Sequence, residues 1–434
     1  MNRELVDSGV EWIGKIPSNW EIRKLSSIAK RITDYVASGS FATIKKNVTY
    51  LDKPDYAMLI RTADLSQKTN KEPVYINKHS YEFLSNSNLF GGELILPNIG
   101  SVGEVYYYEP MYERASLAPN AILVDMKGSN RFYYYFFKNP LIGDALKNLG
   151  NDSVQAKFNK TQLRQLKVLN PPFEEQKKIA NFLDEKVSQI NLIIRNTKQS
   201  IEELNKYKQS IITETVTKGL NPNVEMKYSG LEWLGYIPKH WNLTKIKNIF
   251  EIKKVIANKL GFDVLSVTQQ GLKIKDIESN EGQLSSDYTK YQIVEKNDFV
   301  MNHMDLLTGW VDCSKYIGVT SPDYRVFKFK KVNEEYSHDY FKYLLQSCYF
   351  NKVFYGFGQG VSNFGRWRLQ TNAFLNFYFP VPDIKEQYEI SMFLNEKCAG
   401  IDSIIAKKEK LLAEMESYKK SLIYEYVTGK KEVL

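Results

Sequence analysis

The stretch SGVEWIGKIPSNW, residues 8–20, returns nearly unchanged as SGLEWLGYIPKHW, residues 229–241, which lie 221 positions further along the chain. Two tryptophans eight positions apart, with a glycine and a proline at fixed places between them, do not recur by chance. A second repeat begins at Glu175-Gln176 and reappears 211 positions later at Glu386-Gln387. The chain is therefore a tandem duplication of a unit of about 210–220 residues.

The two copies differ strongly between these matched ends. The first contains Arg61-Thr62-Ala63-Asp64-Leu65 where the second contains Ser266-Val267-Thr268-Gln269-Gln270. The offset falls from 221 to 211, so the second middle is ten residues shorter. A common frame around two unlike middles indicates two similar tasks performed on different targets.

A long helix is predicted at the end of each copy. Pro171-Pro172 cannot continue a helix backwards, and Glu174 and Glu175 place acidic side chains at the positive end of the helix that follows. Apolar residues then recur in heptads over about 40 residues, which is typical of a coiled coil. The predicted seam residues are Leu183, Val187, Ile190, Ile194, Ile201, Leu204, Ile211, Leu394, Cys398, Ile401, Ile405, Leu412, Met415 and Leu422.

Polar residues interrupt both heptad rows at matching places, Thr197 with Lys408 and Lys208 with Lys419. Such residues either fix the register of the pair or extend their amines into water from the seam. Because each helix follows its own globular block, we expect an antiparallel pair that acts as a molecular spacer.

Composition narrows the class of protein. The 434 residues carry 59 Lys and Arg against 50 Asp and Glu, which gives a net charge of +9, and 43% of them are hydrophobic, enough for packed cores. No apolar stretch is long enough to cross a bilayer, and the first residues contain no apolar core of a signal peptide. Three widely spaced cysteines predict a reducing, cytoplasmic setting without disulfides or a thiolate zinc site.

The positive charge lies in two blocks. Residues 1–170 carry 22 basic and 17 acidic side chains, and residues 229–383 carry 19 and 16, whereas the segments between and after them are nearly balanced. This distribution fits two polyanion-binding modules joined by neutral connectors, although an ordinary solvated surface accounts for the charge equally well.

The twin SGxEWxGxIPxxW segments and the twin helix openings, Pro171-Pro172-Phe173-Glu174-Glu175-Gln176 and Pro380-Val381-Pro382-Asp383-Ile384-Lys385-Glu386-Gln387, resemble the specificity subunit of type I restriction–modification systems. The resemblance covers essentially the whole chain, and only Val381 and Asp383 depart from the first copy's paired prolines. It implies an α+β fold with two target recognition domains, at 1–170 and 221–382, and two helices, at 171–220 and 383–434, that form an antiparallel coiled coil with pseudo-twofold symmetry.

The resemblance also implies a function and partners. Each recognition domain would read one half of a split, asymmetric target on double-stranded DNA, and the helix pair would set the gap and dock two methyltransferase subunits. Those subunits would hold S-adenosylmethionine and methylate adenine, and restriction (translocase–nuclease) subunits with ATP and Mg would complete the enzyme. This chain itself would hold no cofactor or metal and would catalyse nothing.

Base reading in the major groove favours Arg, Lys, Asn and Gln on loops and element ends. The strongest candidate is the stretch 359–368, because its glycines allow close backbone approach and two arginines flank a tryptophan. For each candidate a solvated loop is the competing interpretation. The predicted DNA-binding residues are Lys45, Lys46, Lys68, Lys157, Gln269, Gln270, Asn302, Gln359, Asn363, Arg366 and Arg368.

Two other classes of protein remain as alternatives. Asn170-Pro171-Pro172-Phe173 and Phe354-Tyr355-Gly356-Phe357-Gly358 have the letters of DNA adenine methyltransferase motifs. A cofactor loop should end a strand and open a helix, whereas Phe354 follows a predicted helix, so we reject a self-contained methyltransferase. A coiled-coil scaffold that binds proteins explains the helices but not the two divergent basic blocks.

Overall fold

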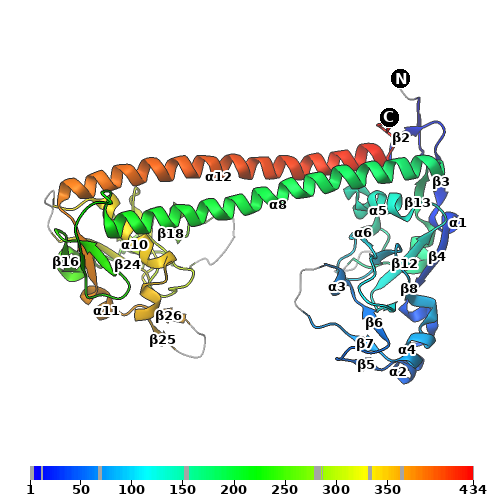
Figure 1. Ribbon diagram of the computed structural model, residues 1–434, viewed down its shortest axis with the longest axis horizontal. Coiled ribbons are helices and arrows are strands. Elements are labelled where there is room, and N and C mark those ends of the chain that lie inside the picture. Colours follow the sequence, from blue (N-terminus) through cyan, green and yellow to red (C-terminus); the bar gives the residue numbers. More distant parts are fainter. Residues whose placement is uncertain are drawn as a thin grey trace. The chain divides into compact units, whose positions relative to one another are not determined.

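The computed structural model describes residues 4–10, 13–66, 71–150, 156–277, 285, 287–330, 335–361 and 366–433 (Figure 1). The chain divides into two compact units, and each is considered by itself. Unit 1 comprises residues 1–198 and 410–434, and unit 2 comprises residues 199–409. Each long helix therefore contributes one part to each unit.

A four-stranded antiparallel sheet occurs in both units with the same strand order. In unit 1 it runs β10 (Tyr106–Tyr107), β9 (Leu94–Pro97), β12 (Ala121–Met126), β4 (Ala29–Asp34). In unit 2 it runs β22 (Val311–Cys313), β21 (Phe299–Met301), β24 (Arg325–Phe329), β17 (Phe250–Lys253). The duplicated sequence thus folds into the same sheet twice, although few of the residues match.

The remaining strands differ between the units. Unit 1 has a mixed sheet of β5 (Tyr50–Leu51), β7 (Tyr75–Ile76), β6 (Ala57–Ile60), β11 (Ala115–Leu117) and β8 (Asn88–Leu89). Unit 2 instead pairs β18 (Leu265–Thr268) with β19 (Gly271–Ile274), β20 (Gln292–Val294) with β23 (Gly318–Thr320), and β25 (Gln359–Val361) with β26 (Arg366–Arg368). The unlike middles of the sequence therefore form unlike structures on a common sheet.

Matching elements tie each shared sheet to the long helices. Two-stranded pairs join β3 (Glu21–Lys24) to β13 (Lys167–Asn170) and β16 (Asn242–Lys245) to β27 (Tyr378–Val381). Each repeated tryptophan segment contains a strand that pairs with the strand just before the segment, β2 (Lys15–Pro17) with β1 (Leu5–Asp7) and β15 (Tyr236–Pro238) with β14 (Met226–Tyr228). The shorter helices are α1 (Leu25–Ile28), α2 (Phe41–Asn47), α3 (Thr62–Ser66), α4 (Lys78–Phe83), α5 (Asn130–Lys138), α6 (Pro140–Lys147), α7 (Lys160–Gln165), α9 (Ile246–Ile249), α10 (His338–Phe350) and α11 (Thr371–Asn376), with 3-10 turns at Tyr35–Ser38, Ser85–Ser87 and Phe354–Phe357.

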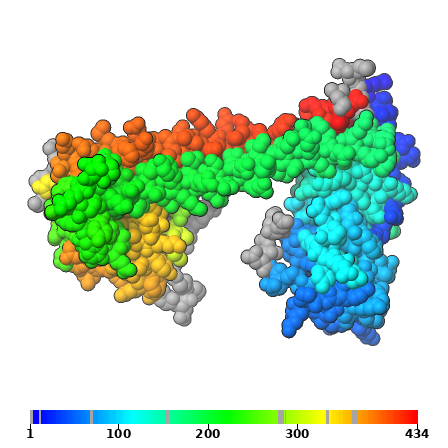
Figure 2. All heavy atoms as spheres, viewed as in Figure 1, coloured from blue at the N-terminus to red at the C-terminus, as the bar shows by residue number. Residues whose placement is uncertain are grey.

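The two predicted long helices are α8 (Phe173–Lys218) and α12 (Ile384–Val427). In unit 1 Phe182 lies against Tyr426, and further along α8 Asn191 accepts a hydrogen bond from Lys419, so the helices run antiparallel. In unit 2 the Lys208 amine binds Asp402 at 2.6 Å. Figure 2 shows the atoms of α8 and α12 in direct contact within each unit. The polar interruptions at Lys208 and Lys419 therefore bond to the opposite helix.

The predicted seam residues face the interior of the pair. Fully buried are Leu183, Ile190, Ile194, Leu394, Cys398, Ile401 and Leu422. Half-buried are Val187, Ile201, Leu204, Ile211, Ile405, Leu412 and Met415. The ends of the seam join the cores of the globular parts, where aromatic residues of α5 and α10 pack against the shared sheets.

The repeated tryptophans connect each globular part to a long helix. The Trp20 indole donates to Glu175 at 2.9 Å, and the Trp241 indole donates to Glu386 at 2.8 Å. Both rings are buried, as predicted for residues that pack in the core. Trp233 is half-buried and stacks on Phe377, while Trp12 lies outside the described residues.

Among the residues that the structure describes, no helix is both long and apolar enough to cross a bilayer. Within the same ranges, no group of three or more His, Cys, Asp or Glu side chains is arranged to hold a metal ion.

Candidate nucleic-acid interface

One loop in unit 2 gathers three stretches that are far apart in the sequence. This loop, residues 302–309, follows β21 of the shared sheet. Gln269, at the tip of the β18–β19 hairpin, donates to the Thr308 carbonyl at 3.3 Å. The backbone N–H of Leu306 donates to the Trp367 carbonyl at 3.2 Å, and that of Leu369 donates to the His303 carbonyl at 3.0 Å. The predicted residues Gln269, Asn302 and Arg368 therefore belong to one region of the fold.

The β25–β26 hairpin presents two of the predicted residues side by side. Gln359 pairs directly with Arg368, and Gly360 pairs with Trp367, so the first pair and the second occupy opposite faces of the hairpin. The Trp367 indole donates to the Tyr355 carbonyl at 2.6 Å and its ring lies 5.4 Å from that of Tyr355. This tryptophan thus anchors the hairpin to the protein, and Gln359 and Arg368 lie on the other face.

Arg325, at the start of β24, places a second cation near Arg368, because it bonds to the next residue, Leu369. Arg325 is 4% exposed, and its guanidinium donates to the Leu369 carbonyl at 3.0 Å and lies 4.6 Å from the centre of the Phe374 ring. Burial lowers its pKa to about 10, with a further contribution from Arg368, so it stays charged at neutral pH. Among the described residues, neither arginine has a carboxylate partner. Two cations without a counter-ion raise the local positive potential, which attracts a polyanion.

His303 adds a neutral hydrogen-bonding group to this region. Burial and the two arginines Arg325 and Arg368 lower the pKa of its imidazole to about 3. The ring is therefore uncharged at neutral pH and offers one donor and one acceptor. A neutral imidazole beside two guanidinium groups avoids a third positive charge in the same place.

Unit 1 repeats the essential part of this arrangement. Lys157 precedes Phe158 as Arg368 precedes Leu369, at the helix offset of 211 positions. The Phe158 N–H donates to the Asn98 carbonyl at 3.2 Å, in the loop after β9, just as Leu369 donates to the loop after β21. No ion pair holds Lys157 within the described ranges. Within the described ranges, Lys157 and Arg368 are therefore cations without an ion pair at the same place in the shared frame of the two units.

The other predicted residues are dispersed. Lys45 and Lys46 are exposed in the last turn of α2, and Gln270 is exposed at the β18–β19 turn, where it accepts from Lys273. Asn302 lines a cavity of 650 Å³ together with Tyr288, Tyr291 and Tyr324. Lys68 and Asn363 lie outside the described residues, and for Arg366 only the backbone register with Val361 is described.

Arg325 and the correspondence of Lys157 with Arg368 escaped the sequence analysis. Arg325 is the first residue of the buried strand segment Arg-Val-Phe. Because arginine is rarely buried without a specific role, a charged residue at such a position indicates a candidate functional residue. The correspondence was detectable by applying the helix offset of 211 to the middles, but the surrounding residues there do not match.

The methyltransferase-like motifs have structural roles. Asn170 ends β13 and accepts a hydrogen bond from the Tyr133 hydroxyl at 3.2 Å. Phe354 lies in a 3-10 turn that follows α10 rather than a strand, as predicted from the aromatic run before it. The Phe354 motif, which corresponds to the cofactor loop, therefore lacks the strand–loop–helix setting that such a loop requires, and residues 170–173 are the connection from β13 to the long helix α8.

Comparison with known proteins agrees with this architecture. A family model described as "Type I restriction modification DNA specificity domain" matches residues 17–203. Over almost its whole length the chain is similar to specificity subunits of type I restriction–modification systems.

Two relatives from Methanocaldococcus jannaschii match along almost the whole chain. A specificity subunit assigned to the type I restriction enzyme MjaX is 26% identical over 97% of this chain and 96% of its own length. The MjaVIII specificity subunit is 24% identical over 96% and 94%. A chain of a type I R-M system, solved in a study of complex assembly and conformational transition, has a similar fold with a TM-score of 0.68, 10% identity, and coverage of 96% of this chain and 99% of its own.

Proposed function

We propose that this specificity subunit reads a bipartite, asymmetric DNA target, with one half-site bound by the globular part of each unit. The observation that carries the proposal is the four-stranded sheet that both units share, with different strands attached to it in each. A shared support places two readers in equivalent positions, and unlike attachments give them unlike sequence preferences. A target read in this way has two different halves.

Lys157 and Arg368 are the residues that we propose to contact DNA in the two half-sites. Both lie at the same place in the frame, and neither is held in an ion pair within the described ranges. In unit 2 the hairpin of β25 and β26 has dimensions that the major groove accommodates, and Gln359 and Arg368 project from one face of it. Arginine pairs with the O6 and N7 atoms of guanine, whereas lysine there adds phosphate attraction or a single hydrogen bond.

We also propose that the helix pair docks two methyltransferase subunits, one at each unit. Among the exposed large apolar residues of the helices are two matching pairs, Ile193 with Ile404 and Tyr207 with Tyr418, whose members are 211 positions apart. Each directly precedes a residue of one heptad row of its helix, the row of Val187 and Ile194 in α8 and the row of Cys398 and Ile405 in α12. Unit 1 holds Ile193 and Tyr418, and unit 2 holds Tyr207 and Ile404. Two equal apolar patches fit two copies of one partner.

In this proposal the chain is not itself catalytic. The partner subunits would supply S-adenosylmethionine and transfer the methyl group to adenine, and restriction subunits would bind through them. The residues of this chain would hold the DNA in register and position the partners relative to it.

The test is to map N6-methyladenine by single-molecule sequencing in cells that lack other methylases. Three strains express a cognate methyltransferase subunit alone, this chain alone, and both together. We expect methylation only in the third strain, at a split asymmetric motif. Methylation by this chain alone would establish a self-contained enzyme. A complex that assembles and leaves DNA unmethylated would favour the protein-binding scaffold.

Matched variants test the individual residues in the same assay. Lys157→Ala should relax or weaken one half of the motif and Arg368→Ala the other half, while Lys385→Ala, exposed on α12, should change neither. Loss of the same half in both variants would contradict the assignment. For the patches, Tyr207→Ser with Tyr418→Ser should abolish assembly with the methyltransferase subunit but leave the thermal stability of this chain unchanged.

A further inference from the structure

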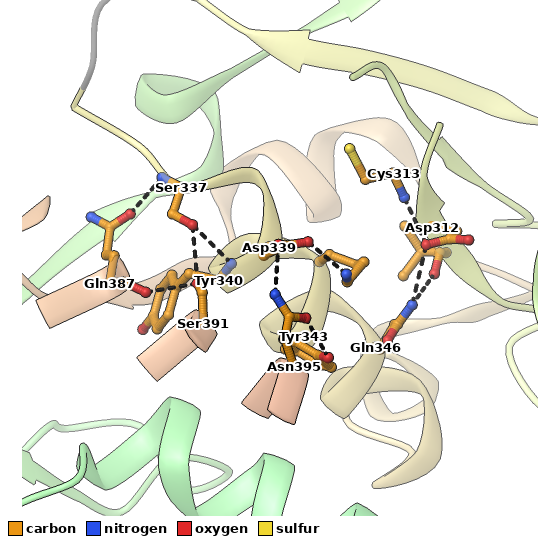
Figure 3. A network of polar contacts seen from close by, with 12 residues as sticks. Asp312, Cys313, Ser337, Asp339, Tyr340, Tyr343, Gln346, Gln387, Ser391 and Asn395 are labelled. Atoms are coloured by element: carbon orange, nitrogen blue, oxygen red, sulfur yellow. Dashed lines mark hydrogen bonds and ion pairs between the residues drawn. The ribbon is translucent and has the colours of Figure 1, made fainter. Parts of the chain in front are cut away.

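Each globular part contacts its long helix through a seam of polar side chains, and the two seams are built alike. We call these contacts the docking seams. In unit 2 the backbone N–H of Ser337, the N-cap of α10, donates to Gln387 at 2.9 Å (Figure 3). In unit 1 the N–H of Ser129, the N-cap of α5, donates to Gln176 at the same distance. Both glutamines are buried, so both docking seams contain the same buried hydrogen bond.

A second shared contact lies two turns further along. The Tyr343 hydroxyl donates to the Asn395 side-chain oxygen at 2.8 Å, and the Tyr135 hydroxyl donates to Asp184 at 2.6 Å. Asn395 lies 211 positions after Asp184, the offset that also relates the two glutamines. Burial raises the pKa of each tyrosine far above its ordinary value, so both hydroxyls remain donors.

The third contact differs in charge. In unit 1 Arg131 is the second residue after the N-cap, and its guanidinium binds the Asp184 carboxylate at 2.6 Å. In unit 2 the second residue after the N-cap is Asp339, and its carboxylate accepts from the Asn395 amide at 2.9 Å (Figure 3). The globular part therefore supplies the cation in one seam and the anion in the other. The helix residue is an anion in the first and a neutral amide in the second.

We propose that the docking seams select which globular part rests on which long helix. Asp339 opposite Asp184 would place two carboxylates at hydrogen-bond distance, which is unfavourable because one of them must take up a proton. Arg131 opposite Asn395 would lose its ion pair. The shared serine–glutamine and tyrosine contacts permit docking of either part, and the third contact discriminates between them. The physical basis of this selection does not depend on the proposed function.

The surrounding charges are consistent with this assignment. Asp339 also binds Lys342 at 2.6 Å, so the unit 2 seam is already satisfied without a charge on the helix. Arg131 lies over the rings of Tyr107 and Tyr134, at 4.6 and 5.2 Å from their centres, which holds its guanidinium towards Asp184. Asn395 has a neutral side chain, whereas a carboxylate at that position would face Asp339 directly.

The first experiment uses the full chain in its native order. Asn395→Asp should lower the melting temperature at pH 7 by on the order of 4 °C, and adding Asp339→Asn should restore most of it. In unit 1 Arg131→Asp should lower it by a similar amount or more, and adding Asp184→Asn should raise it again, although Asp184→Asn alone is destabilising. Asn196→Asp, at an exposed position of α8, is the matched control and should have little effect.

The second experiment exchanges residues 4–170 and 221–382 in the full chain. In the exchanged chain, residues 221–382 precede α8 and residues 4–170 precede α12. The pair Asp184→Asn with Asn395→Asp should raise the melting temperature of the exchanged chain and lower that of the native one. Effects of the same sign in both chains would overturn the proposal. If the exchanged chain does not fold, independent, additive effects in the native-order variants would overturn it by themselves.

Discussion

Gln387→Leu provides a direct test of how the globular part of unit 2 is held. Gln387 is 1% exposed, accepts from the Ser337 N–H at 2.9 Å and donates to the Pro382 carbonyl at 3.0 Å. Leucine has a similar volume, so the change removes these hydrogen bonds without leaving a large cavity. It leaves a buried N–H and a buried carbonyl with no partner. At about 1–3 kcal/mol for each of these two groups, the free energy of unfolding should fall by about 2–6 kcal/mol.

The assay is urea-induced unfolding followed by tryptophan fluorescence, with calorimetry on the same samples. A loss of this size corresponds to a fall of about 10 °C in melting temperature for a unit of this length. Gln176→Leu, which breaks the bonds to Ser129 and Pro171 in unit 1, should cost a similar amount. Gln189→Leu is the control, because that glutamine is exposed and bonds only to Glu185 within the described ranges. If Gln387→Leu and Gln189→Leu cost the same, the buried hydrogen bonds do not hold the globular part.

Three further predictions concern pH, salt and backbone conformation. The pKa of His303 is about 3 in the folded chain and near its ordinary value of 6.5 in the unfolded chain, so the unfolded state binds more protons between these values. The free energy of unfolding should therefore fall as the pH drops below about 6.5. His303→Gln should flatten that decline in urea titrations, and an unchanged decline would exclude this histidine as its cause. Asp402→Asn breaks the ion pair with Lys208 between the helices. Because Asp402 is half-exposed, the free energy of unfolding should fall by less than about 1 kcal/mol, and this loss should disappear in 1 M salt. A larger loss that does not depend on salt would contradict this reasoning. Gly219 and Gly230 both have a φ of +77°, but a Cβ at Gly219 would lie 3.0 Å from Glu386 and 3.3 Å from Trp241, whereas a Cβ at Gly230 would meet no atom within 4 Å. Gly219→Ala should therefore lower the free energy of unfolding more than Gly230→Ala does, by on the order of 1 kcal/mol. Equal losses would show that the Cβ at Gly219 is not crowded.

Much of the fold was predictable because its signals are local. The heptads that begin near Leu183 and Leu394 specify two long helices by themselves, since side chains three and four positions apart share a helix face. The tandem duplication, the α+β class and the resemblance to type I specificity subunits could be recognised from the repeated frame. Burial of Trp20 and Trp241 followed as well, because large residues that recur at fixed places in a frame usually pack in its core.

The arrangement of the candidate interface was not predictable, because it depends on contacts between distant parts of the chain. Nothing in the letters around Gln269, His303 and Leu369 indicates that one loop joins them through single hydrogen bonds. The bond from the Trp367 indole to the Tyr355 carbonyl likewise has no signal in the sequence. The domain boundaries at 170, 220 and 382 and the choice of DNA-contacting residues stay predictions.

The division of the chain has a consequence for its synthesis. Unit 2 consists of one continuous stretch, whereas the core of unit 1 includes Leu422, Ile423 and Val427, which the ribosome adds more than two hundred residues after α8. Unit 2 can therefore complete its core while unit 1 still exposes one side of its own. The part of the molecule whose translation begins first is therefore the last to become fully folded. Until α12 is complete, this part exposes apolar surface, and either a chaperone or rapid completion of the chain limits aggregation.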